Sequence, residues 1–173
     1  MSIIVEKTDL QQVLLITPPT VFNDNRGHYI ELYNHKLYND AGIGINFVQD
    51  DISVSGRDVL RGLHGDSETW KLISCPLGQI YLVVVDNQPS SAQYKHWQSF
   101  TLSEQSPRQV LVPPNHGLGH LVMSERACFS YKQSSYYNRE KQFTLAWNDP
   151  ALGISWPVHT PILSERDSSA KFI

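Results

Sequence analysis

Cysteine is scarce in this chain, which has only Cys75 and Cys128 among 173 residues. Both lie inside apolar, strand-like runs, and they form no CxxC pair. Two isolated thiols cannot build a disulfide framework, and a structural zinc site requires more ligands at closer spacing. The sequence therefore predicts buried, unpaired thiols.

Excess positive charge is also lacking. Lys and Arg number 14 against 17 Asp and Glu, which gives a formal net charge of -3 and an isoelectric point near 6.1. Nucleic acid is therefore not a predicted partner, although a few arginines can still bind a small phosphorylated ligand. Residues 1–15 include Glu6, Lys7 and Asp9 among their apolar residues, which predicts no membrane span and a cytoplasmic protein.

Several catalytic motifs are absent. The chain has no GxxxxGK[ST], GxGxxG, GxSxG or HExxH segment, which argues against P-loop hydrolases, Rossmann dehydrogenases, esterases and zincins. His116 and His120 have the spacing of two ligands on a helix, but Gly117, Gly119 and the preceding prolines oppose a helix. No third ligand is evident, so no metal site is predicted.

The chain consists mainly of short segments rich in Val, Ile, Tyr and Phe, separated by Gly, Pro, Asn and Asp, a pattern typical of β-strands. The predicted strands are 13–16, 28–33, 47–55, 59–64, 71–75, 80–85, 96–102, 109–112, 119–123, 127–133 and 143–147. A helix is predicted at 34–41, and a turn over 113–119.

The length of the chain and the absence of repeats or linkers predict a single domain, 1–173. Many short strands at turn-like intervals predict an all-β sandwich or barrel such as a double-sheet jelly roll. Ile80–Val85 is apolar on both faces, as expected for a central strand.

Alternation along the predicted strands places polar side chains on inward faces. His64 shares a face with Gly62, Tyr131 with Phe129, and Lys71 with apolar residues. Each also has a structural interpretation, as a satisfied histidine, an amphipathic core tyrosine or a lysine reaching water. A base, a phenol and a cation in one cavity would instead suit proton transfer beside a carbonyl.

Six ordered segments together resemble the dTDP-4-dehydrorhamnose 3,5-epimerase family. They are Phe22–Glu31, Val59–His64, Lys71-Leu72, Tyr131-Lys132, Trp147–Pro150 and Ile154–Pro157. The resemblance implies a cupin-type double-sheet jelly roll with short peripheral helices, a homodimer, and catalysis without metal or organic cofactor. It also implies epimerisation at C3, C5 or both of a nucleotide-diphosphate 4-keto sugar, for surface polysaccharide biosynthesis.

The resemblance further implies residue roles. His64 would be the base, Asp167 would orient it, Tyr131 would be the acid, and Lys71 would stabilise the enolate oxygen. Arg26, either from the same chain or from across a dimer, and Arg61 would bind the diphosphate. The other implied substrate-binding residues are Glu31, Gln49, Asp51, His120, Gln142 and Arg166.

The chain also departs from the family pattern. Leu118 replaces the usual substrate-contacting histidine, and His120 is expected to substitute for it. Gly65-Asp66 replaces a common Tyr-Gln, which is expected to leave space beside His64 for a longer sugar. These changes resemble a branch that acts on GDP-linked 4-keto heptoses, and the nucleotide base and sugar length stay open. Two other functions also stay open, a 3,4-ketoisomerase on the same scaffold and a non-catalytic sugar-binding cupin.

Overall fold

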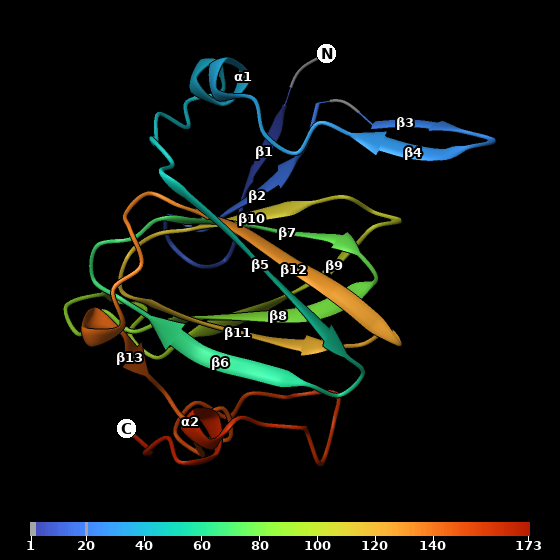
Figure 1. The fold of residues 1–173 in the computed structure, drawn as a ribbon. Coiled ribbons are helices and arrows are strands. Elements are labelled where there is room, and N and C mark those ends of the chain that lie inside the picture. The colour runs from blue at the N-terminus through green and yellow to red at the C-terminus, as the bar shows by residue number, and fades with distance from the viewer. Residues whose placement is uncertain (1–2, 20) are drawn as a thin grey trace.

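Two antiparallel sheets dominate the computed structural model, which describes residues 3–19 and 21–173 (Figure 1). The larger sheet has the order β1 (Ile4–Lys7), β2 (Leu14–Thr17), β10 (Gln109–Val112), β7 (Lys71–Leu77), β12 (Arg126–Gln133) and β5 (Gln49–Gly56). The smaller has the order β13 (Phe143–Thr144), β6 (Leu60–Gly65), β11 (His116–Val122), β8 (Gln79–Asp86) and β9 (Trp97–Ser103). The two sheets form the layers of a jelly roll, so the predicted all-β, double-sheet fold is confirmed.

A third, two-stranded sheet projects from the body as an arm (Figure 1). It consists of β3 (Val21–Asp24) and β4 (Gly27–Ile30), which pair antiparallel. Phe22 and Tyr29 on this arm are exposed, at 53% and 63%. The sequence predicted only the second of these strands, because β3 is polar and short.

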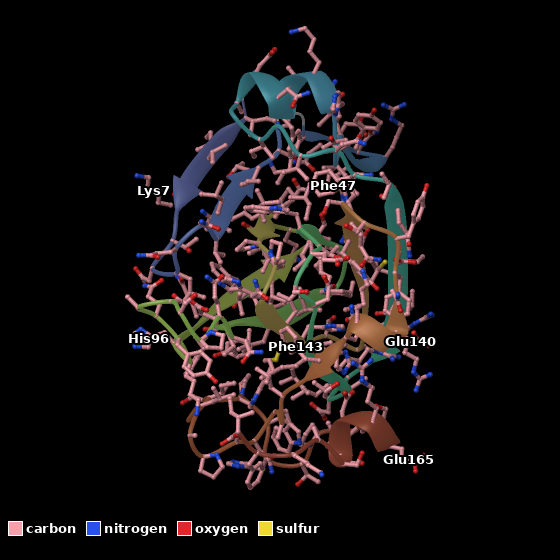
Figure 2. The ribbon with its side chains drawn as sticks, turned by 90° about the vertical axis from the view of Figure 1, so that its left-hand side faces the viewer. Lys7, Phe47, His96, Glu140, Phe143 and Glu165 are labelled. Atoms are coloured by element: carbon pink, nitrogen blue, oxygen red, sulfur yellow. The ribbon has the colours of Figure 1, made fainter. Side chains whose placement is uncertain are left out.

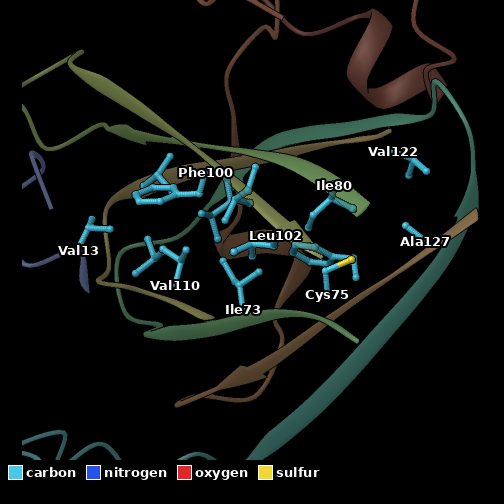
Figure 3. Close-up of a cluster of buried hydrophobic side chains, with 14 of the residues drawn as sticks. Val13, Ile73, Cys75, Ile80, Phe100, Leu102, Val110, Val122 and Ala127 are labelled. Atoms are coloured by element: carbon cyan, nitrogen blue, oxygen red, sulfur yellow. The ribbon is translucent and has the colours of Figure 1, made fainter. Parts of the chain in front are cut away.

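The core lies between the sheets (Figure 3). Ile73, Cys75 and Val110 of the larger sheet pack with Ile80 and other apolar residues of the smaller one. Burying each large aliphatic side chain contributes about 1.5–3 kcal/mol. Both cysteines are free and buried, as predicted.

Strand β8, which lies between β11 and the edge strand β9, is buried on both faces, as its sequence predicted. Leu82 and Val84 face the main core, whereas Val83 and Val85 pack with Leu63 in a second cluster. Leu145, Leu152 and other residues of the C-terminal segment complete that cluster. The C-terminal segment therefore covers the outer face of the smaller sheet.

The turn predicted over 113–119 is correct only in its first part. Pro114 and Asn115 lie in a turn, whereas residues 117–119 lie within strand β11. A Cβ atom on Gly119 would lie 2.9 Å from Leu63 Cδ2 and 3.2 Å from the ring of Trp156. The glycine is thus required by close packing within a strand, which the sequence does not distinguish from a turn signal.

Short helices lie at opposite ends of the molecule (Figure 2). Helix α1 (His35–Asp40) is capped by Asn34, whose side chain accepts from Leu37 N at 3.2 Å, which confirms the predicted helix. Helix α2 (Glu165–Ser168) lies near the C-terminus, and a 3-10 turn, η1, spans Arg139–Lys141. No helix in residues 3–19 and 21–173 is long and apolar enough to cross a membrane.

Candidate active site

A cavity of about 370 Å³ is lined by both main sheets and by the C-terminal segment. All four predicted catalytic residues and four predicted binding residues line it. The lining consists of Ile52, Ser53, Arg61, His64, Lys71, Leu118, His120, Phe129, Tyr131, Gln133, Tyr137, Gln142, Ser164, Arg166 and Asp167. Residues more than 100 positions apart thus meet at one site, where β6 and β11 face β7 and β12.

A histidine and a buried carboxylate form a dyad in this cavity. His64 Nε2 lies 2.6 Å from Asp167 Oδ1, and Asp167 is only 3% exposed. Ser164 Oγ donates to Asp167 Oδ2 at 2.9 Å. Burial would raise the pKa of Asp167, but hydrogen bonds from His64, Ser164 and the Gly62 backbone, with the attraction of His64, lower it overall.

Because an ionised carboxylate only accepts hydrogen bonds, the dyad assigns the ring proton of His64 to Nε2. Among the described residues, Nδ1 of this ring has no hydrogen-bond partner. The second nitrogen is therefore able to accept a proton from a bound ligand.

Tyr131 places its phenol in the same cavity, from β12. Its ring packs at 5.2 Å from that of Phe129, as the predicted alternation requires. Burial, with smaller contributions from Asp51 and Tyr137, raises the pKa of Tyr131 to about 12. The hydroxyl is thus protonated at neutral pH and can act as a proton donor.

Lys71 is buried at the cavity wall, with 8% exposure. Its Nζ donates to Asp66 Oδ2 at 3.3 Å, and Gln142 Nε2 donates to the same oxygen at 2.9 Å. Burial lowers the pKa of Lys71, and the attraction of Asp66 opposes this shift. The anion that a buried lysine requires is therefore present.

His120 forms part of the wall beside the dyad. Its ring stacks on Phe129 with centroids 4.0 Å apart and an interplanar angle of 6°. Burial, reinforced by the positive charge of Arg61 and by His64, lowers the pKa of His120 to about 3. This imidazole is neutral at working pH and can only donate or accept hydrogen bonds.

Two arginines line the cavity, and the guanidinium group of each donates two hydrogen bonds to one hydroxyl oxygen. Arg61 donates from Nε and Nη2 to Ser55 Oγ at 3.2 and 3.1 Å. Arg166 donates in the same way to Thr144 Oγ1 at 2.9 and 2.8 Å. Each guanidinium keeps further donors for an anionic ligand.

Four predicted binding residues do not line the cavity of their own chain. Arg26 lies on the β3–β4 arm and pairs with Asp24 at 2.5 Å, and its side chain is 86% exposed. Glu31 lines a separate depression on the outer face of the larger sheet. The arm that carries Arg26 points away from the body (Figure 1), and the contact of both residues with the substrate stays a prediction.

Gln49 and Asp51 lie just behind the cavity lining. Gln133 Nε2 donates to Asp51 Oδ2 at 2.7 Å, and the backbone N–H of Tyr137 donates to Gln49 Oε1 at 2.8 Å. These two residues therefore hold lining residues in place.

The space expected at Gly65 is not present. A Cβ atom there would lie 2.2 Å from His116 O and 2.4 Å from the Phe143 ring. Gly65 is therefore required by packing and does not enlarge the sugar pocket, so that expectation is wrong.

Sequence reasoning missed two polar groups at the site. Ser53 Oγ is buried in the lining and has no hydrogen-bond partner among the described residues. Asp66 was noted only as a departure from the family pattern. Alternation within the predicted strand 47–55 would have placed Ser53 inward beside Asp51, but nothing local pairs Asp66 with Lys71.

Comparison with known proteins identifies the family. The sequence model for dTDP-4-dehydrorhamnose 3,5-epimerase matches residues 7–173. The chain belongs to this family. It is a nucleotide-sugar 3,5-epimerase, an isomerase acting on carbohydrates, as the ordered motifs predicted.

Relatives of this epimerase match it over almost its whole length. The dTDP-4-dehydrorhamnose 3,5-epimerase of Shigella flexneri is 37% identical over 172 residues, covering 96% of this chain and 94% of the relative. The Legionella pneumophila enzyme, solved in complex with dTDP-4-keto-L-rhamnose, has a TM-score of 0.92 and 34% identity, covering 98% and 92% of the two chains.

A Bacillus anthracis enzyme with TDP and PPi bound has a TM-score of 0.93 and 34% identity, covering 99% and 100% of the two chains. The cupin-type jelly roll implied by the motifs is thereby confirmed.

Proposed function

We propose that this epimerase inverts C3, C5 or both of a dTDP-linked 4-keto-6-deoxy sugar, with His64 as base and Tyr131 as acid. One observation carries the proposal. An imidazole oriented by a buried carboxylate, a protonated phenol and a buried ammonium line one cavity. We propose that these side chains act without a metal or organic cofactor, as the family resemblance implies.

The reaction divides into two proton transfers. Nδ1 of His64 removes the proton from the carbon beside the ketone. The C–H electron pair forms a C=C bond to the carbonyl carbon, and the C=O π pair moves to oxygen to give the enolate. The ammonium of Lys71 stabilises the charge on the enolate oxygen, as fixed cations do in a dry site. Tyr131 then returns a proton to the opposite face of that carbon, which inverts it, and each positioned transfer contributes about 10²–10⁴ in rate.

The remaining cavity groups suit a nucleotide sugar. Arg61 and Arg166 offer donors to a diphosphate, and Ser53 and neutral His120 offer hydrogen bonds to uncharged sugar oxygens. The ligands of the two solved relatives are thymidine nucleotides or their sugars, which supports dTDP as the carrier. The closed packing around Gly65 gives no support for a heptose.

We also propose that the enzyme acts as a homodimer. Ile52 and Val54 on β5, the strand at the edge of the larger sheet, are 68% and 45% exposed, and the arm carries exposed Phe22 and Tyr29. Apolar groups on a sheet edge and a projecting arm favour association. Sedimentation velocity should give twice the chain mass, and a monomer at micromolar concentration would contradict this.

The proposed location is the cytoplasm. Cys75 and Cys128 are both free, in keeping with a reducing compartment. Fractionation of the source cells with an antibody to the chain tests this location directly.

The function is tested by incubating the enzyme with dTDP-linked and GDP-linked 4-keto sugars in D2O. We expect deuterium at C3, C5 or both of the dTDP sugar, with the ketone remaining at C4. Migration of the ketone to C3 would identify a ketoisomerase, and no deuterium uptake with any sugar would leave only a binding function. Faster turnover of a GDP-linked 4-keto heptose would show that this sugar, and not the dTDP-linked sugar, is the substrate.

A further inference from the structure

We propose that Asp66 is a positioning residue whose carboxylate pairs with Lys71 and fixes its ammonium at the wall of the cavity. The catalytic consequence rests on the proposed function, whereas the pairing itself does not. Asp66 is 5% exposed and is not part of the cavity lining, so it acts on the substrate through the lining residues that it contacts, of which Lys71 carries the charge.

The two carboxylate oxygens of Asp66 have separate partners. Oδ1 accepts from the backbone N–H groups of Glu68 and Thr69 at 3.0 and 2.7 Å, which closes the turn after β6. Oδ2 accepts from Lys71 Nζ at 3.3 Å and from Gln142 Nε2 at 2.9 Å. The turn thus holds one oxygen rigidly, and the other faces the ammonium.

Lys71 requires this anion because its surroundings disfavour a positive charge. Burial lowers the pKa of Lys71, and Arg166 lowers it further, while the charge and hydrogen bond of Asp66 oppose both. The other charged or titratable groups that line the same cavity are Arg61, His64, His120, Tyr131, Tyr137 and Asp167. Asp66 is the acidic group that contacts the ammonium directly.

The pairing leaves the lysine able to bind substrate. An ammonium has three N–H donors, and Asp66 takes one of them. The remaining donors are available to the ketone oxygen, which becomes the enolate oxygen in the proposed reaction. Asp66 therefore sets both the protonation and the direction of the group that stabilises the enolate.

Asp66→Asn tests this role, because Asn keeps the Oδ1 acceptor of the turn and replaces the charged Oδ2 acceptor of Lys71 and Gln142 with a neutral amide NH2. Glu68→Gln is the matched control, since Glu68 lies two residues further on and pairs with exposed Lys141 at 2.8 Å. Asp66→Ser, whose hydroxyl can accept from the same turn, replaces the Asn variant if that variant does not fold.

The primary readout is NMR titration of [13Cε]lysine-labelled protein without substrate, with the Lys71 signal assigned by its loss in Lys71→Arg. We expect the Lys71 midpoint to fall by about one pH unit or more in Asp66→Asn and to stay constant in Glu68→Gln. An unchanged midpoint in a folded Asp66 variant would overturn the proposal.

The second readout is the pH dependence of deuterium exchange. We expect the alkaline limb of kcat to move to lower pH in Asp66→Asn by the shift seen in the titration. If the titration shifts but the unaltered enzyme exchanges no deuterium, the proposed function fails and the pairing of Asp66 with Lys71 stands. A shifted titration with an unmoved alkaline limb would refute the catalytic consequence.

Discussion

Replacing Asp167 by Asn should disable the base without disturbing the fold. The carboxylate is buried and 2.6 Å from His64 Nε2, and it stabilises the imidazolium that forms when the base takes a proton. Two charges with centres about 4 Å apart interact by about 4 kcal/mol at an effective dielectric constant of about 20. Since each 1.36 kcal/mol is a factor of ten in rate, the loss should be about a thousandfold.

A second effect acts in the same direction. The Asn amide group can donate to Nε2, which would move the ring proton to Nδ1, the atom proposed to accept the substrate proton. The assay is deuterium uptake at C3 and C5 under single-turnover conditions, with folding checked by circular dichroism. Glu165→Gln is the control, because it removes an exposed carboxylate from the same helix. An Asp167→Asn variant that is folded and exchanges within threefold of the unaltered enzyme would refute the dyad.

Three further predictions concern the acid, the packing and the pH dependence of stability. Tyr131→Phe should retain part of the deuterium exchange at the first centre but lose inversion, which product NMR would show; undiminished inversion would remove Tyr131 from the mechanism. Gly65→Ala should destabilise the protein by about 1–3 kcal/mol in urea unfolding, because its Cβ would meet His116 O at 2.2 Å. The folded pKa values of Asp66 and Asp167 are lowered, so their contribution to stability is present above the unfolded carboxyl pKa of about 3.9 and is lost as the pH falls through the lower folded values. Between pH 5 and pH 2 the urea midpoint of Asp66→Asn should therefore decline less than that of the unaltered protein. Equal declines of the two midpoints would contradict this.

The sequence predicted the parts of the fold that depend on local pattern. Alternation correctly placed Tyr131 and Phe129 on one face, and the apolar run Ile80–Val85 correctly indicated a strand covered on both sides. The exposed strand β3 lacks apolar alternation and was missed. Gly119 resembled a turn residue because the Leu63 contact that requires it comes from another strand.

The candidate site was predicted mainly from motifs. Contacts between its residues that depend on the three-dimensional fold were not predicted, as in the rest of the fold. The family resemblance implied the roles of His64 and Asp167, which are 103 residues apart in the chain and hydrogen-bonded in the structure. The Asp66–Lys71 contact depends on the geometry of the turn after β6, which no local pattern encodes. Arg26 contacts Asp24 within its own arm and does not line the cavity of its own chain. Its predicted contact with a substrate therefore requires the arm to reach the cavity of a second chain.

The most direct test of the account is deuterium uptake by His64→Ala in D2O with a dTDP-linked 4-keto-6-deoxy sugar. His96→Ala is the control, because this histidine is exposed and lies at the periphery of the molecule (Figure 2). The account predicts no enzyme-dependent uptake at C3 or C5 for His64→Ala and normal uptake for His96→Ala. Normal uptake by folded His64→Ala would show that another group removes the proton and would contradict the mechanism.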